Sequence, residues 1–212
     1  MKTINVLLFL TCVLCAPVAF CTESSSDSNA AGEAFRASYA SEKSMEYEEA
    51  IKAILPLKET PALKYVVNVR LGWLYYLNAS YANSRNAYQT ALKTTPGSIE
   101  AKLGYMLPVL AQGNFDEAEL IAKQIIEVDK LNYYANLRMA YALRMQRKFL
   151  DAEKIDTQML QYFPSDVTLL TELALAKVGQ NRPAKKIFND ILTLDPDNAT
   201  AKYYIEKFPK LQ

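Results

Sequence analysis

Small residues recur along this chain at a fixed interval of 34 residues. One column consists of Ala50, Ser84, Ala118 and Ala152, and Ala184 follows 32 residues later. A second column has Met106 as its one large member: Ser38, Gly72, Met106, Ala140 and Ala174. The same interval relates an aromatic column (Tyr47, Tyr81, Phe115, Phe149) and a terminating column (Pro96, Lys130, Pro164, with Pro196 32 residues later). Periods of roughly 20–50 residues indicate stacked units, and about 34 is typical of a helix–turn–helix repeat.

Each unit contains two stretches with apolar residues at helical spacing. In the second unit these stretches are 71–77 and 81–92, separated by a turn at 78–80. Antiparallel helices approach closely only where small residues face each other, so we expect Gly72 to meet Ser84. The predicted fold is all-α, a right-handed α-solenoid of about five helix–turn–helix repeats plus a C-terminal capping helix. The expected units are 31–64, 65–98, 99–132, 133–166 and 167–198, followed by a lone helix over 199–208.

These residues resemble the tetratricopeptide repeat. The second unit has Leu71-Gly72 and Tyr75, followed by Ser84, Tyr88, Ala91 and Pro96. The pattern returns as Gly113, Phe115 and Ala118, and again as Ala140, Leu143, Ala152 and Pro164. The resemblance extends over Ala34 to Leu211. It implies stacked helix pairs with a concave surface that binds other proteins.

Several positions depart from the pattern. Pro56 interrupts the second helix of the first unit, and the fifth unit lacks two residues around 179–183, which predicts a tighter turn. Asp156 stands where the repeat has a large apolar residue, so this part of the fourth unit is expected to face water. Pro108 falls inside a helix, with Gly104 four residues earlier giving its ring room.

The N-terminus has the pattern of an export signal. Lys2 precedes an apolar run from Val6 to Phe20, and cleavage is expected after Cys21. The predicted organisation is therefore a signal peptide at 1–21, a flexible Ser-rich leader at 22–33 and a solenoid domain at 34–212. A retained membrane anchor is disfavoured because the run is short and contains Pro17. Lipid modification of Cys21 stays open, although the bulky Phe20 before it disfavours that processing.

The composition limits the partners of the mature chain. Cys12, Cys15 and Cys21 leave with the signal, so no disulfide or thiolate metal site is expected. Loss of Lys2 lowers the 24 basic residues to 23, equal to the 23 acidic ones. A charge near zero provides no field for nucleic acid or an anionic membrane. We expect an exported protein, periplasmic or secreted, of a bacterial envelope, with no stable membrane insertion after cleavage.

The sequence contains none of the motifs that catalysis commonly uses. It has no histidine and only 6 glycines, with no phosphate-binding loop or HExxH motif. The paired carboxylates Glu48-Glu49 and Asp116-Glu117 begin second helices, where they suit the helix dipole. We therefore expect no enzyme activity, no catalytic residue, no cofactor and no metal.

The resemblance also implies a binding groove. In this family the first helix of each pair lines the concave surface at about the fifth, ninth and twelfth positions of each unit. Most of those positions, with two arginines beside them, give twelve candidate groove residues: Phe35, Tyr39, Val69, Arg70, Trp73, Tyr76, Leu103, Leu107, Leu137, Arg138, Tyr141 and Arg144. Family members that bind acidic C-terminal peptides have Asn at the ninth position. Here Trp73, Leu107 and Tyr141 occupy it, so that carboxylate clamp is not expected.

Three hypotheses about function follow. The first is a non-enzymatic adaptor that holds a peptide or helix of an envelope protein in an apolar, aromatic groove. The second is a self-assembling scaffold, a homo-oligomer, and the third is an accessory subunit of envelope polysaccharide or cell-wall machinery. The repeat register also predicts that Gly72→Ala is near neutral and that Gly72→Leu destabilises the fold.

Overall fold

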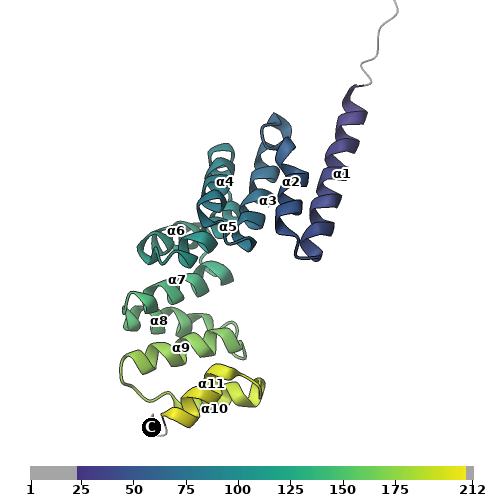
Figure 1. Ribbon diagram of the computed structural model, residues 1–212. Helices are drawn as coiled ribbons and strands as arrows, with labels where there is room; N and C mark the ends of the chain where they lie inside the picture. Colours follow the sequence, from purple (N-terminus) through teal and green to yellow (C-terminus); the bar gives the residue numbers. More distant parts are fainter. Residues whose placement is uncertain (1–22, 209–212) are drawn as a thin grey trace, which may run out of the picture.

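The computed structural model describes residues 23–208, and this part of the chain is all-helical (Figure 1). The predicted signal peptide and the Cys21 cleavage site lie outside the described residues. Two short 3₁₀ turns, Leu55–Leu57 and Pro61–Leu63, connect the second helix to the third. The α-helices are α1 (Glu23–Lys43), α2 (Tyr47–Ile54), α3 (Lys64–Leu77), α4 (Tyr81–Thr94), α5 (Ile99–Ala111), α6 (Phe115–Val128), α7 (Tyr133–Met145), α8 (Phe149–Met159), α9 (Val167–Gly179), α10 (Lys185–Leu194) and α11 (Ala199–Lys207).

Consecutive helices pair into the five predicted units, and α11 closes the array. Each helix packs against its neighbours in the chain, and first helices also contact the first helices of adjacent units, as α3 does α5 and α5 does α7. The units follow one another along an arc in Figure 1, from α1 at one end to α10 and α11 at the other. This confirms the predicted right-handed α-solenoid with a closing helix.

The two small-residue columns form the contacts between paired helices. All five members of the first column are at most 1% exposed, and the second column is buried throughout. In the second unit the Ser84 hydroxyl donates a hydrogen bond of 2.6 Å to the carbonyl of Gly72. The predicted register between paired helices is therefore correct.

The turn inside each unit uses one left-handed residue, and these residues also recur every 34 positions: Met45, Ala79, Gly113, Arg147 and Asn181. Glycine adopts this conformation without strain, but only Gly113 is a glycine. The turn of the fifth unit therefore keeps its left-handed residue. Its two missing residues come from the start of α10, which begins only at Lys185. The expected tightening of the turn is in fact a shortened second helix.

Side-chain caps begin the first helices of units three to five and the closing helix α11. Ser98, Asn132, Asp166 and Asn198 each accept a hydrogen bond of 2.9–3.0 Å from the backbone N–H three residues ahead. Such a cap stabilises a helix by about 1 kcal/mol because it pairs an N–H that has no partner within the helix. Each cap lies two residues after a member of the terminating column.

The structure differs from the sequence analysis at the N-terminus. The segment from Glu23 to Glu33, expected to be a flexible leader, belongs to α1, although Thr22 lies outside the described residues. A helix pairs its backbone groups internally, and Ala30 and Ala31 are good helix formers. The extension therefore needs no apolar face of its own. Pro56, as predicted, lies just after α2 ends at Ile54.

Two further expectations are wrong. Asp156 does not face water: its side chain is 0% exposed. Gly72 has no room for a methyl group, because an added Cβ would lie 2.7 Å from the ring of Tyr88. The same ring also lies beside Gly104, where an added Cβ would come within 2.2 Å of it, and Pro108 lies inside α5 as predicted. Both errors concern side chains that reach across from the paired helix.

Candidate interaction groove

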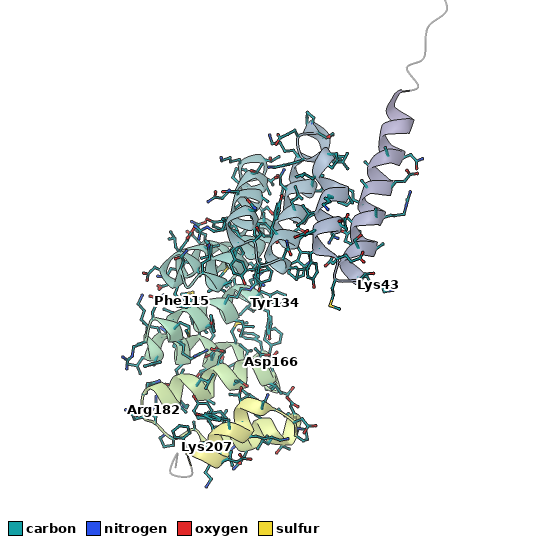
Figure 2. The ribbon with its side chains drawn as sticks, viewed as in Figure 1. Lys43, Phe115, Tyr134, Asp166, Arg182 and Lys207 are labelled. Atoms are coloured by element: carbon teal, nitrogen blue, oxygen red, sulfur yellow. The ribbon has the colours of Figure 1, made fainter. Side chains whose placement is uncertain are left out.

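A cavity of about 720 Å³ lies on the side of the solenoid formed by the first helices. Its walls come from α1, α3, α5 and α7, with Tyr88 reaching in from α4. Eight of the twelve candidate groove residues line it: Phe35, Tyr39, Val69, Arg70, Trp73, Leu103, Leu107 and Arg138. Figure 2 shows the side chains along the arc, with Tyr134 of α7, another lining residue, on its inner side.

The repeat explains why these side chains meet. Residues 34 apart occupy equivalent places on successive first helices, so Phe35, Val69 and Leu103 form one row. Tyr39, Trp73 and Leu107 form the next row. A third row is Arg70, Gly104 and Arg138, in which the glycine separates two guanidinium groups. Because the solenoid is curved, the three rows converge on its inner side.

Arg70 is the centre of a polar network at one end of the cavity. It is only 6% exposed, donates a hydrogen bond of 3.1 Å to Ser38 and forms an ion pair with Glu42. Its guanidinium lies 3.9 Å from the ring centroid of Tyr39, and its buried Nη2 has no hydrogen-bond partner among the described residues. Arg70 is thus neutralised but retains one free donor.

Glu42 joins this network to Trp73, whose indole N–H donates a 2.6 Å hydrogen bond to its carboxylate. Burial by itself raises the pKa of Glu42. The hydrogen bonds from Trp73 and Arg70, with the charge of Arg70, outweigh burial and leave the pKa below its ordinary value. Glu42 is therefore ionised at neutral pH and fixes the orientation of both side chains.

Arg138 occupies the other end of the third row. Its Nη1 donates a 2.5 Å hydrogen bond to the carbonyl of Leu103, and the guanidinium lies 5.5 Å from the ring centroid of Tyr134. Burial lowers the pKa of Arg138 from its ordinary value. No described carboxylate lies within ion-pair distance of it, in contrast to Arg70.

The other four candidate groove residues do not line the cavity. Tyr76 packs between Trp73 and Tyr81, with ring centroids 5.9 and 6.0 Å away. Tyr141 packs edge-on against Phe115 at 6.1 Å, and Arg144 pairs with Glu172 at 2.7 Å. Leu137 is half-buried on α7, outside the lining. Packing within the second unit therefore occupies Tyr76, and packing between neighbouring units occupies Tyr141 and Arg144.

Sequence reasoning missed seven lining residues: Glu42, Tyr65, Val66, Tyr88, Glu100, Gly104 and Tyr134. Val66, Glu100 and Tyr134 are also 34 residues apart, so extending the stripe one helical turn toward the N-terminus would have found them. The Tyr65 hydroxyl pairs with Ser98 Oγ and donates to Glu100, both at 2.7 Å, at the cavity rim. The predicted groove did not include Tyr88, because it used first helices only and Tyr88 belongs to a second helix.

The described residues offer no other kind of site. In residues 23–208, no group of three or more acidic or cysteine side chains is placed to hold a metal ion. Within the same range, no helix is long and apolar enough to cross a membrane.

Neither protein-family models nor curated proteins give a match to this sequence. Several solved structures do match the fold of this chain. A tetratricopeptide repeat protein from Parabacteroides merdae superposes with a TM-score of 0.72 at 15% identity, over 86% of this chain and 76% of that one. MamA from Desulfovibrio magneticus RS-1 superposes with a TM-score of 0.70 at 12% identity, over 80% of this chain and 97% of MamA. MamA from AMB-1 gives 0.66 at 15% identity, over 86% and 99%.

At these identities the similarity establishes the fold. The chain has the fold of these structures, an α-solenoid of stacked helix pairs like that of the tetratricopeptide repeat protein.

Proposed function

We propose that this protein is a non-enzymatic, exported adaptor that holds a peptide or helix of an envelope protein in its concave cavity. The observation that carries the proposal is the gathering of eight candidate groove residues, with Tyr134, around a single cavity of about 720 Å³. Tyr, Trp and Arg are enriched among the residues that dominate binding energy at interfaces.

The exposure and the fixed orientation of the lining side chains support binding. Tyr39 and Tyr134 are 57% and 56% exposed, so each ring offers aromatic surface to water in addition to its contact with the Arg70 or Arg138 guanidinium. Trp73 and Arg70 are held in place by Glu42. Fixed anchors lose little conformational entropy on binding, which favours affinity.

Intrinsic fluorescence gives a direct test, because Trp73 is the only tryptophan of the chain. Dodecapeptides would be selected from a displayed random library on the wild-type protein, and tryptophan-free binders would be titrated while Trp73 emission is followed. We expect saturable changes in emission. Tyr39→Ala should weaken binding by about tenfold or more, as expected of an interface hot spot.

Tyr162→Ala is the matched control, since Tyr162 is 55% exposed, similar to Tyr39, but lies outside the cavity. It should change affinity by less than about twofold. Equal losses in both variants, or selected peptides that leave Trp73 emission unchanged, would show that the cavity is not the binding site.

The exported location rests on the N-terminal sequence pattern and has its own test. We expect cell fractionation to recover the protein outside the cytoplasm and N-terminal sequencing to begin at Thr22. A cytoplasmic protein that keeps Met1–Cys21 would exclude export and with it the envelope partner, while leaving the cavity free to bind another protein.

Self-assembly is the second candidate, favoured by aromatic side chains at the closing end of the solenoid. Tyr203 and Phe208 are 52% and 45% exposed, with ring centroids 6.0 Å apart. Light scattering over a concentration series separates the candidates. A strict monomer at high concentration would exclude the scaffold.

A further inference from the structure

Arg138 holds a positive charge that no described group of the protein balances. Its one hydrogen bond within residues 23–208 goes to the Leu103 carbonyl, which carries no net charge. Burial opposes the charged form, as the lowered pKa of Arg138 shows. A partly desolvated guanidinium with free N–H groups binds strongly to an anionic oxygen, because charge-assisted hydrogen bonds are about twice as strong as neutral ones.

Phenol groups lie near this guanidinium. Its carbon lies 5.5 Å from the ring centroid of Tyr134, and Tyr88 and Tyr134 line the cavity together with Arg138. The Tyr88 hydroxyl lies beside Gly104, where an added Cβ would come within 2.8 Å of it. Each phenol can donate one hydrogen bond. The cluster therefore combines one cation with neutral donors on the cavity wall.

The other charged groups of the cavity already have partners. Glu42 pairs with Arg70 and accepts from Trp73, and the exposed Glu100 accepts from Tyr65. These carboxylates repel a doubly charged group such as a phosphate more strongly than a single carboxylate, whose charge matches that of Arg138. The arc continues past α7 through α9 to α11, so nothing in the structure ends a bound segment at Arg138 (Figure 1). An acidic side chain within a longer segment fits this arrangement better than a chain terminus.

We propose that Arg138, with the hydroxyls of Tyr88 and Tyr134, binds the carboxylate of an Asp or Glu side chain in an otherwise apolar peptide ligand. This deepens the proposed function and rests on it. The subsite differs from the carboxylate clamp of the family, whose ninth-position asparagines are replaced here by Trp73, Leu107 and Tyr141. The apolar part of the peptide would lie along the rows of Phe35 and Tyr39.

The test uses the same displayed dodecapeptide library, fused through its C-terminus so that only side chains supply carboxylates. Selection on the wild-type protein should enrich Asp and Glu at one position relative to the input library. Selection on Arg138→Gln should not. Arg147→Gln is the control, because Arg147 is exposed and lies outside the cavity. It should select like the wild type.

Selected peptides would then be made with amidated C-termini, in pairs that differ only by Asp→Asn or Glu→Gln, and titrated through Trp73 emission. On the wild-type protein the amide peptide should bind about tenfold more weakly, whereas on Arg138→Gln the pair should differ less than about twofold. Arg138→Lys, which keeps the charge, should retain part of the discrimination. Circular dichroism and urea midpoints would show that each variant is folded.

The outcomes separate this inference from the proposed function. Peptides that bind in the cavity without a preference for acidic residues, or whose preference survives Arg138→Gln, would overturn the subsite while leaving the groove intact. If no peptide is enriched and Trp73 emission never changes, both fail. A free C-terminal carboxylate that replaces the acidic side chain at equal affinity would overturn the assignment to a side chain.

Discussion

At the residue scale, the ring of Tyr88 determines which side chains two neighbouring helices can carry. It is 2% exposed and packs against Gly72 of α3 and Gly104 of α5. A Cβ would lie 2.7 Å from the ring at Gly72 and 2.2 Å from it at Gly104, and real Cβ contacts are not this short. Both glycines are therefore needed for packing and also bring Tyr88 to the cavity.

The loss of stability on substituting these glycines should follow the same order, larger at Gly104 than at Gly72. Alanine removes the helix penalty of glycine, about 1 kcal/mol, but overpacking costs about 1–3 kcal/mol. Gly104→Ala should therefore lower the free energy of unfolding, by more than Gly72→Ala does. Gly97→Ala, with nothing within 4 Å, is the control and should not clash. Urea unfolding measures all three, and an unchanged midpoint for Gly104→Ala would contradict the packing of Tyr88.

Asp156 is the second residue whose environment matters. Both carboxylate oxygens are buried and have no hydrogen-bond partner within residues 23–208, where α8 packs against α7 and α9. Burial, reinforced by the charge of Glu172 and opposed by Arg144, raises the pKa of Asp156 to about 8. Glu172 and Arg144 pair with each other, so Arg144 is not free to neutralise Asp156.

The sign of the pH dependence follows from linkage. Between about pH 4 and 8 the folded protein keeps a proton on Asp156 that the unfolded chain releases, so the free energy of unfolding falls as pH rises, by up to about 1.4 kcal/mol per unit. Below pH 4 the effect is absent, and above pH 8 it is complete. Asp156→Asn removes it.

The free energy of unfolding of Asp156→Asn, minus that of the wild type, should therefore increase from pH 5 to pH 8 in thermal unfolding. Asp151→Asn, at an exposed position of the same helix, is the control and should show no such increase. A difference that stays constant over this range would mean that Asp156 is ionised in the folded protein.

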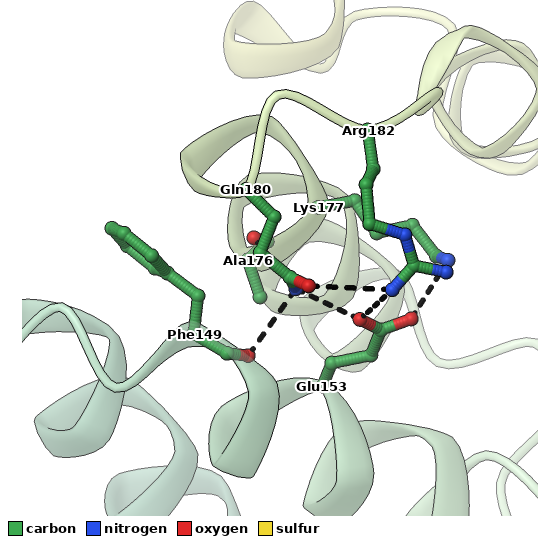
Figure 3. Close-up of polar contacts among 6 residues, drawn as sticks. All are labelled: Phe149, Glu153, Ala176, Lys177, Gln180 and Arg182. Carbon is green, nitrogen blue, oxygen red and sulfur yellow. Dashed lines mark hydrogen bonds and ion pairs between the residues drawn. The ribbon is translucent and has the colours of Figure 1, made fainter.

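At the scale of elements, Glu153 of α8 holds the end of α9 and the loop that leads into the shortened α10 (Figure 3). Its carboxylate pairs with Lys177 at 2.8 Å and Arg182 at 2.5 Å, and accepts a 2.8 Å hydrogen bond from Gln180. Burial raises the pKa of Glu153, but these contacts outweigh it and leave the pKa below its ordinary value. One carboxylate thus fixes the end of α9 and the loop before the shortened α10.

Glu153→Gln should loosen this junction. It leaves Lys177 and Arg182 without their counter-charge, and we expect a loss of about 1–2 kcal/mol in the free energy of unfolding. Hydrogen exchange should increase in 177–185 before it does in α3 to α6. Asp190→Asn breaks the exposed pair with Lys186 and serves as control, with little change expected. Equal exchange in both variants would exclude the role of Glu153.

At the scale of the whole molecule, each unit depends on its neighbours for burial. The end of the array is closed by α11, where Tyr204 stacks on Phe188 with ring centroids 5.0 Å apart and Ala201 is fully buried. Phe188 and Ile191 are also fully buried, in one cluster with these residues. In a solenoid of this kind, stability is approximately a sum of unit and interface contributions.

Deletion of residues 199–212 should therefore expose Phe188 and Ile191 and lower solubility. Protection from hydrogen exchange should fall first across α10, while α3 to α6 keep theirs. Substitution of Tyr203→Ser, at an exposed position of the same helix, is the control and should leave α10 protected. Unchanged protection of 185–194 in the truncated protein would contradict the capping role of α11.

The repeat architecture could be determined from the sequence alone. Contacts within a stacked unit are local and repeat with the chain, so the 34-residue columns correctly predicted the helix pairs, the small-residue contacts and the closing helix. The candidate groove residues came from the resemblance to the tetratricopeptide repeat, and eight of the twelve line one cavity because equivalent positions on successive first helices lie side by side.

The tertiary structure alone decided which side chains from the second helices reach those rows. Tyr88, Asp156 and Phe188 share one register position, yet one reaches the cavity, one is a buried acid and one packs under α11. Their roles depend on the volume left by the residue opposite and by the next unit. That volume is a property of packed helices in three dimensions, and no spacing along the chain encodes it.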